Sequence, residues 1–196
     1  MDELFLLDEV REPPTGPNRI LVGLRLPSDV AEDVSDWSLK FRQERSLKGN
    51  PRPTDLLHLT LLLLGDFKWL PADLISAAQR ACNAVASRSR PFALQVDQAV
   101  CGGKKEVKLP FVLKSEKRNS ALDLLYQRLF IQMDLEGIEG DKRKRFEPHV
   151  TVGYMDRTLR AESIDPIAWM VNEIFLIHSL VGQSQYIELG RWKLGA

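Results

Sequence analysis

The sequence predicts an α+β protein in which outer helices cover antiparallel β-sheets. Three observations indicate this class. Apolar strand-like runs cluster between three segments with helical periodicity, a pattern that does not fit regular alternating βα units. The order strand, helix, strand occurs in both halves of the 196-residue chain. Each half ends this order with one short motif, His58-Leu59-Thr60 or His149-Val150-Thr151, which predicts a weak internal duplication with pseudo-twofold symmetry around a central groove.

The first half begins with a buried strand at residues 19–26. Ser28 is expected to cap the next helix, whose first turns carry acidic residues near the positive end of the helix dipole. The first motif strand covers about residues 56–64 and is expected to end at Gly65. Pro71 marks the start of a second helix. The apolar stripes of these helices are Val30, Val34, Trp37 and Phe41, and Leu74, Ala78, Ala81 and Val85.

The second half contains the clearest helix, at residues 119–135, where leucines and a methionine repeat in helical register. Gly102-Gly103 predicts a turn between two strands. Pro110 lies in the second of these strands and cannot donate to a ladder, so that strand is expected at a sheet edge. The strands predicted in this half are 92–97, 107–114, 148–154, 173–178 and 186–194.

The length fits a single domain with a buried core and is too short for two enzymes of ordinary size. The turn-rich stretch PPTGPN separates an expected N-terminal arm, residues 1–18, from one domain at residues 19–196. Lysine plus arginine equal aspartate plus glutamate at 27 each, which argues against a protein that coats long duplexes. Any nucleic-acid partner is expected to be contacted over a short length.

Cys82 and Cys101 are too few cysteines for a disulfide framework or a CxxC metal site, and they favour a reducing compartment. No DxD, HExxH or Cys/His cluster predicts a metal site, and no cofactor is expected. The acidic N-terminus lacks the features of a signal peptide, and no apolar run is long enough to span a membrane. We therefore expect a cytoplasmic monomer without a membrane partner.

The paired His-x-Thr motif is the strongest functional signal. The chain has three histidines, and two of them carry a threonine two residues later. Composition alone would give such a pair in roughly one of five hundred chains of this make-up. Residues two apart in a strand project from the same face, so each histidine and its threonine point together. The motifs predict one site lined by His58, Thr60, His149 and Thr151.

These residue types suit phosphoryl chemistry. Histidine exchanges protons near neutral pH, and two imidazoles on opposite sides of a substrate can act as base and acid in one step. That division fits in-line displacement at phosphorus. The threonine hydroxyls can donate hydrogen bonds to the non-bridging oxygens, where negative charge develops. No step of this scheme calls for a metal ion.

The chain resembles the two-histidine (2H) phosphoesterases, and most closely the RNA 2′,3′-cyclic phosphodiesterases formerly called 2′-5′ RNA ligases. The resemblance covers nearly everything after the arm. It rests on an opening strand that ends in Leu-Pro, on HLTLLLLGD and PHVTVGY, and on the closing FLIHSL and SQYIELGRWKL, in that order. The two motifs together are quite specific, whereas each alone is weak.

The resemblance implies a bilobal fold, with His58 and His149 as the acid/base pair and Thr60 and Thr151 as phosphate ligands. It implies opening of a 2′,3′-cyclic phosphate at an RNA 3′ terminus to a 2′-phosphate, and its reversal as 2′-5′ ligation. Members of this branch often carry an arginine three residues after the second threonine, where this chain has Tyr154. Tyr154 can stack on a base instead or pack into the groove wall. Which histidine is the base is not assigned.

Other readings stay open. The chain can be a phosphodiesterase for another small cyclic phosphate or a 2′-5′ oligonucleotide, or a non-catalytic module that binds RNA ends or nucleotides. Two intact histidines favour an enzyme, because a pure binder needs no pair of proton carriers. His178 lacks a threonine partner and is interpreted as structural or surface-exposed. The possible substrate-binding residues are Ser179 and Tyr186, from the closing motif, Tyr154, and Arg145 in the basic run before the second motif strand, with Arg52 as a weaker candidate.

Overall fold

The computed structural model describes residues 16–102, 109–139 and 146–195. In this part of the chain, nine strands form one sheet. They are β1 (Asn18–Arg25), β2 (Gly49–Pro51), β3 (His58–Phe67), β4 (Phe92–Cys101), β5 (Leu109–Lys114), β6 (Val150–Met155), β7 (Leu159–Val171), β8 (Glu173–Leu180) and β9 (Gln185–Lys193). The helices are α1 (Ser28–Glu44), the short 3-10 helix η2 (Thr54–Leu56), α2 (Ala72–Ala86) and α3 (Ser120–Leu135).

The sheet consists of two antiparallel halves. The strand order is β7-β4-β5-β6-β3-β1-β8-β9, with β2 paired to β6. The halves meet between β6 and β3, where Leu59 and Val150 form the pair that joins them. The units β1-α1-β3 and β5-α3-β6 repeat one order, and in each unit the first strand pairs antiparallel with the motif strand. The predicted α+β class with two related lobes is confirmed.

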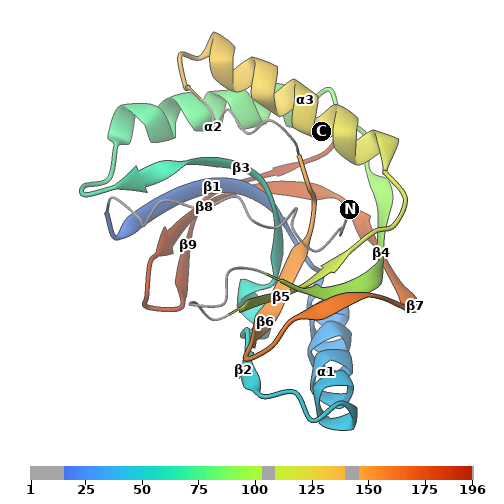
Figure 1. Ribbon diagram of the computed structural model, residues 1–196. Coiled ribbons are helices and arrows are strands. Elements are labelled where there is room, and N and C mark those ends of the chain that lie inside the picture. Colours follow the sequence, from blue (N-terminus) through green and yellow to red (C-terminus); the bar gives the residue numbers. More distant parts are fainter. Residues whose placement is uncertain (1–15, 103–108, 140–145, 196) are drawn as a thin grey trace.

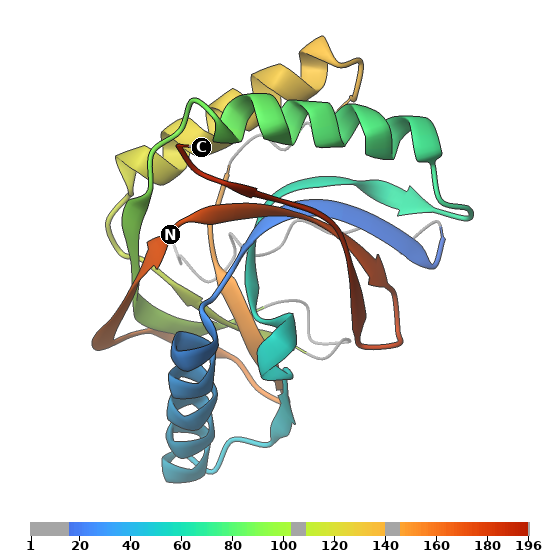
Figure 2. The same cartoon turned by 180° about the vertical axis from the view of Figure 1, so that it is seen from behind.

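The helices lie outside the sheet (Figures 1 and 2). α2 and α3 run side by side over one part of the sheet, where α2 packs against β8 and β9 and α3 packs against β3 and β4. α1 lies at the other end and packs against β7, β2 and β6. The predicted stripe of α3 is buried, at 2% exposure or less: Leu122, Leu125, Leu129 and Met133. One apolar core contains residues of both halves.

The ends of α1 differ from the prediction at one point. Ser28 does not cap this helix, because helical geometry begins at Ser28 itself and the N-cap is Pro27, whose carbonyl accepts a hydrogen bond from the Ala31 N–H at 2.8 Å. By contrast, Asn119 caps α3 and accepts from the N–H groups of Ala121 and Leu122, at 3.1 Å each.

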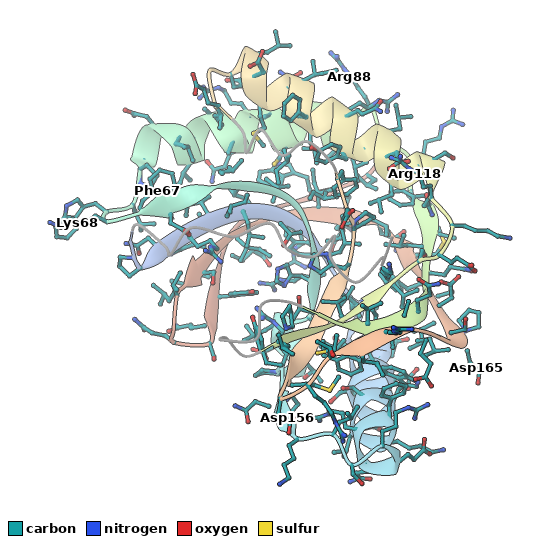
Figure 3. All side chains as sticks on the ribbon, in the orientation of Figure 1. Phe67, Lys68, Arg88, Arg118, Asp156 and Asp165 are labelled. Atoms are coloured by element: carbon teal, nitrogen blue, oxygen red, sulfur yellow. The ribbon has the colours of Figure 1, made fainter. Side chains whose placement is uncertain are left out.

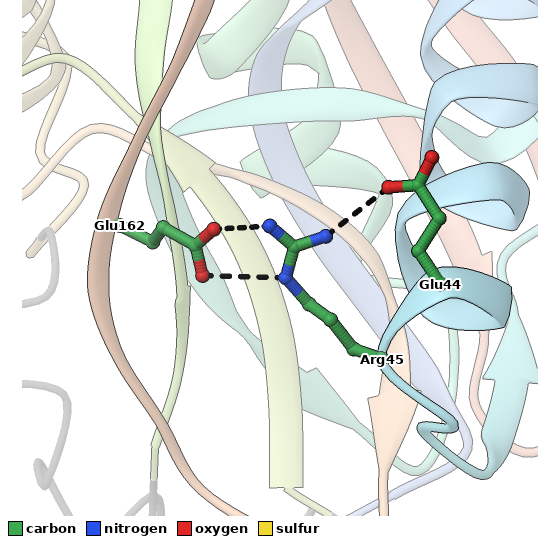
Figure 4. A network of polar contacts seen from close by, with 3 residues as sticks. All are labelled: Glu44, Arg45 and Glu162. Carbon is green, nitrogen blue, oxygen red and sulfur yellow. Dashed lines mark hydrogen bonds and ion pairs between the residues drawn. The ribbon is translucent and has the colours of Figure 1, made fainter.

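Two arginines fix the C-terminal end of α1. Arg45 forms ion pairs with Glu44 and with Glu162 of β7 (Figure 4). Arg157 donates hydrogen bonds to the carbonyls of Arg45 and Ser46, which lie beyond the last helical turn. These contacts tie α1 to the β6–β7 side of the sheet.

The edge prediction for Pro110 was wrong, because β5 lies between β4 and β6. The β4–β5 ladder ends at the pair of Cys101 and Phe111, so Pro110 lies just beyond it and removes no N–H from that ladder. On this side of the sheet the edge strand is β7, which was not among the predicted strands, and β9 forms the opposite edge. The first half of β7 carries the polar residues Arg160, Glu162, Ser163 and Asp165, Pro166 follows them, and the strand lies at the outer edge near Asp165 (Figure 3).

Two boundaries also moved. β3 continues past Gly65 to Phe67, because Gly65 adopts a φ of 143° at a register shift opposite Ile20 and Leu21 rather than ending the strand. β1 begins at Asn18, the last residue of the predicted arm, while residues 1–15 lie outside the described part. Gly103, in the predicted turn, also lies outside it. No described helix has the length and apolar character needed to cross a membrane.

Candidate active site on strands β3 and β6

The two His-x-Thr motifs meet where the halves of the sheet join. Leu59 and Val150 pair there and are buried in the core, at 2% and 0% exposure. Side chains alternate along a strand, so the histidines and threonines project from the opposite face. All of these side chains are partly exposed: His58, Thr60, His149 and Thr151. The structure therefore brings the four predicted residues to one face.

Antiparallel pairing sets which residues of the motifs face each other. Leu59 and Val150 are the one pair between these strands in the described part of the chain, and antiparallel register extended from it sets His58 opposite Thr151 and Thr60 opposite His149. Each histidine has its own threonine two residues along the strand and the other motif's threonine across it. A phosphate placed over this junction can be reached from both strands.

Both imidazole rings are oriented by the same local hydrogen bond. Nδ1 of His58 lies 2.9 Å from the carbonyl oxygen of Leu56, and Nδ1 of His149 lies 2.9 Å from that of Glu147. A carbonyl can only accept, so Nδ1 carries the proton in each ring. In the neutral ring, Nε2 then holds the lone pair and is the atom that takes up a proton.

Tyr186 of β9 packs against the first histidine. Its ring meets that of His58 edge-on, with centroids 5.3 Å apart and an angle of 77°, and its hydroxyl lies 3.5 Å from His58 Nδ1. Arg52 donates to the Tyr186 hydroxyl, and Arg52 Nε donates to the Leu56 carbonyl at 3.1 Å. That carbonyl is also the one that orients His58.

The closing-motif residues Ser179 and Tyr186 lie together, because they are direct partners across β8 and β9. Burial raises the pKa of the Tyr186 phenol, and the charge of Arg52 and hydrogen bonds from Arg52 and Ser179 oppose that rise. The phenol is therefore held in its neutral form, beside His58, as a fixed dipole.

Different contacts hold the approach to the second motif. Phe146, three residues before His149, stacks on Tyr126 of α3, with centroids 4.1 Å apart and ring planes 2° from parallel. An aromatic pair of this kind contributes about 0.5–1.5 kcal/mol beyond the area that it buries. The stack ties the segment before β6 to the outer helix.

Tyr154 reaches the site face through a register shift in β6. Val150 and Val152 are buried, and the next buried side chain with a Cβ is Met155, so the alternation of faces changes between them. This change leaves Tyr154 on the outer face, 39% exposed. Simple alternation would have placed it on the core face.

The remaining candidates lie elsewhere. Arg145 is outside the described residues. His178 lies on the core face of β8, 3% exposed, with Nε2 2.9 Å from the side-chain oxygen of Asn18. Among the described residues there is no group of three or more His, Cys, Asp or Glu placed to hold a metal ion. Burial raises the pKa of the Cys82 and Cys101 thiols to about 12 and about 11, which makes both poor nucleophiles.

Sequence reasoning missed two neighbours of the first motif on β1. Gly23 pairs with Thr60, and Arg25 pairs with His58. A Cβ at position 23 would lie 2.9 Å from the Leu59 carbonyl oxygen and 3.6 Å from Cδ2 of His58. A glycine inside an apolar strand was the available signal, because it often marks a close approach of other groups.

Solved structures share this fold. A structure described as a phosphoesterase has a TM-score of 0.69 at 24% identity, over 92% of this chain and 99% of that chain. LigT of E. coli, complexed with 3′-AMP, has a TM-score of 0.66 at 26% identity, over 92% and 99%. TT0787 of Thermus thermophilus has a TM-score of 0.68 at 22% identity, over 91% and 98%. No curated protein matches the sequence.

The family match covers most of the chain. The model of the 2′-5′ RNA ligase superfamily matches residues 26–183, a span that contains both His-x-Thr motifs and β8. The arrangement of β3 and β6 agrees with the resemblance drawn from those motifs. The chain belongs to the 2′-5′ RNA ligase superfamily, the two-histidine phosphoesterases.

Proposed function

We propose that this protein is a phosphodiesterase that opens 2′,3′-cyclic phosphates at RNA 3′ termini to 2′-phosphates. The observation that carries the proposal is the matched pair of motifs across the β3–β6 junction, with each ring held by a carbonyl two residues earlier. This pair supplies two proton carriers on neighbouring strands, as acid–base catalysis requires.

In the proposed reaction, water attacks phosphorus in line with the bond to the 3′ oxygen. Nε2 of one histidine takes a proton from the water, and Nε2 of the other gives a proton to the 3′ oxygen as the bond breaks. The product is a 2′-phosphate and a free 3′ hydroxyl. Thr60 and Thr151 donate hydrogen bonds to the non-bridging oxygens in the transition state. The reverse reaction would form a 2′-5′ bond.

Tyr154, Tyr186 and Ser179 are proposed to border the substrate. Tyr154 is exposed on the site face and offers a ring to a base, and a stacked base contributes about 1–3 kcal/mol. Ser179 acts through Tyr186, which it faces across the strands. Arg145 stays a proposed steering residue of the basic run. No metal step is invoked, because the four motif side chains can supply both proton transfer and charge stabilisation.

A second substrate class has its own support. E. coli LigT was solved with 3′-AMP, with ATP and with NADP+, all of which are small nucleotides. These complexes support, as the alternative proposal, a cyclic phosphate of a small nucleotide as the substrate of this chain. A non-catalytic nucleotide binder with the same site is the remaining alternative.

The test is hydrolysis of a short RNA with a 2′,3′-cyclic phosphate end, in EDTA, by the wild type, His58→Ala, His149→Ala and His178→Gln. We expect a 2′-phosphate product, with losses of about 10²- to 10⁴-fold in both motif variants. His178→Gln is the matched control, because it removes a histidine on the other face. The wild-type rate should be bell-shaped in pH, since one ring must be neutral and the other charged.

Turnover that survives both motif variants would overturn the histidine mechanism. Activity only on small cyclic nucleotides would favour the second substrate class. Binding without turnover on any cyclic phosphate would leave the binding-module reading.

A further inference from the structure

Arg52 is fixed in place beside the first motif. It lies between Pro51 and Pro53, which restrict the backbone on both sides. Its backbone N–H donates to the carbonyl of Val152 on β6, at 3.0 Å. Its side chain contacts Leu56 and Tyr186, as described above. One residue thus links the second motif strand, the carbonyl that orients His58, and β9.

The positive charge of Arg52 has no described counter-charge. A guanidinium has five N–H donors. One of them, on Nε, binds the Leu56 carbonyl and another binds the Tyr186 hydroxyl, and both acceptors are neutral. The other donors have no partner among the described residues, and no described carboxylate pairs with this guanidinium.

Two other arginines on this face are compensated. Arg19 forms a two-point pair with Asp66, at 2.6 and 2.8 Å, and Arg25 lies 3.6 Å from Glu188. Arg25 is the direct cross-strand partner of His58, so it lies next to the first motif on the adjacent strand. Among these three guanidiniums, Arg52 is the one oriented by neutral groups, which leaves its charge for a ligand.

We propose that Arg52 binds a non-bridging phosphate oxygen of the substrate on the His58 side of the site. This inference rests on the proposed function and adds a specific anion-binding residue to it. Guanidinium presents paired donors that match phosphate oxygens, and a group already held in position loses less conformational entropy on binding. Tyr186 and the Leu56 carbonyl would hold Arg52 and His58 in positions from which both can contact the same phosphate.

The test measures phosphate directly. Inorganic phosphate is titrated by calorimetry into the wild type, Arg52→Gln, Arg52→Lys and Arg25→Gln, at one ionic strength. We expect the Kd for phosphate to rise about tenfold to a hundredfold in Arg52→Gln, because a hydrogen bond between charged groups is lost. Arg25→Gln removes the same charge from the adjacent strand, so it should change Kd by less than about threefold if direct contact matters more than the general field.

A structural role alone would give a different pattern. If Arg52 only positions His58, phosphate Kd would stay at the wild-type value in Arg52→Gln while turnover fell, and the proposal would be overturned. An equal rise in Arg52→Gln and Arg25→Gln would also overturn it, since that pattern reports net charge. If Arg52→Gln does not fold, Arg52→Lys decides: it keeps the charge and loses the paired donors, so a Kd raised about threefold to tenfold is expected and an unchanged Kd contradicts the contact.

The two proposals can fail separately. Phosphate binding that depends on Arg52, together with no hydrolysis of any cyclic phosphate, would retain the anion site and reject the enzyme. Hydrolysis that depends on both histidines, together with phosphate binding that ignores Arg52, would do the reverse.

Discussion

The first and second His-x-Thr motifs share the hydrogen bond that orients the histidine ring and differ in the neighbouring contacts described above. In both, Nδ1 lies 2.9 Å from the carbonyl oxygen two residues earlier. Around the first motif, the support is polar and comes from Arg52 and Tyr186. Around the second, it is an aromatic stack of Phe146 on Tyr126. The orientation of each histidine ring thus depends on a backbone carbonyl two residues earlier. Polar side chains stabilise that segment in the first half, and an aromatic stack stabilises it in the second.

The threonines provide the sharpest comparison of the two halves. Thr60→Val and Thr151→Val each remove one hydroxyl and keep the β-branched shape. If both bind the same transition state, each should lower kcat by about 10²-fold or more, as the loss of one donor to developing charge does. Steady-state kinetics on the cyclic-phosphate RNA would measure this. A large loss in one variant and none in the other would show that the duplication is not functional.

The glycines next to each motif separate catalysis from stability. In Gly23→Ala, the new methyl would lie 2.9 Å from the Leu59 carbonyl and near the His58 ring, so we expect turnover to fall about tenfold and stability by about 1–3 kcal/mol. In Gly153→Ala, the methyl would lie 2.7 Å from the Asn50 carbonyl on β2. That variant should lose similar stability and keep more of its turnover.

Urea unfolding and kcat, measured together on both glycine variants, give the comparison. Equal losses of turnover would mean that the His58 ring has no special sensitivity to its β1 neighbour. If Gly23→Ala lost stability but no turnover, the His58 ring would tolerate the new methyl group without an effect on catalysis.

Sequence patterns predicted what depends on local periodicity. The helix α3 with its apolar stripe and both motif strands follow from spacing along the chain. The site face was predictable for His58 and His149, because alternation along a strand needs no partner. Tyr154 was not, since its face depends on a register shift in β6 that pairing with β5 produces.

Long-range contacts explain the remaining differences. Charged residues in the first half of β7 and Pro166 in its middle interrupt the alternation that marks a strand, so no strand was predicted there, and β7 is held by pairing with β4. Pro110 is tolerated inside the sheet because the ladder between β4 and β5 ends at Phe111, the residue next to it, and does not include Pro110. The contact between Tyr186 and His58 joins residues 128 apart in the chain, which no local pattern encodes.

His178, the third histidine, shows by contrast what the motif histidines avoid. It is buried on the core face, with Nε2 bound to Asn18 and with no partner for Nδ1 among the described residues. Burial lowers its pKa from 6.5. Below pH 6.5 the unfolded chain therefore binds this proton more readily than the folded one, so the free energy of unfolding should fall as pH falls, by at most about 1.4 kcal/mol per pH unit.

His178→Gln can keep the bond to Asn18 without the titration, so urea unfolding at pH 7.5 and 5.5 should show a smaller difference in this variant than in the wild type. The same difference in both proteins would place the acid sensitivity in other groups and leave the buried ring uncoupled from folding.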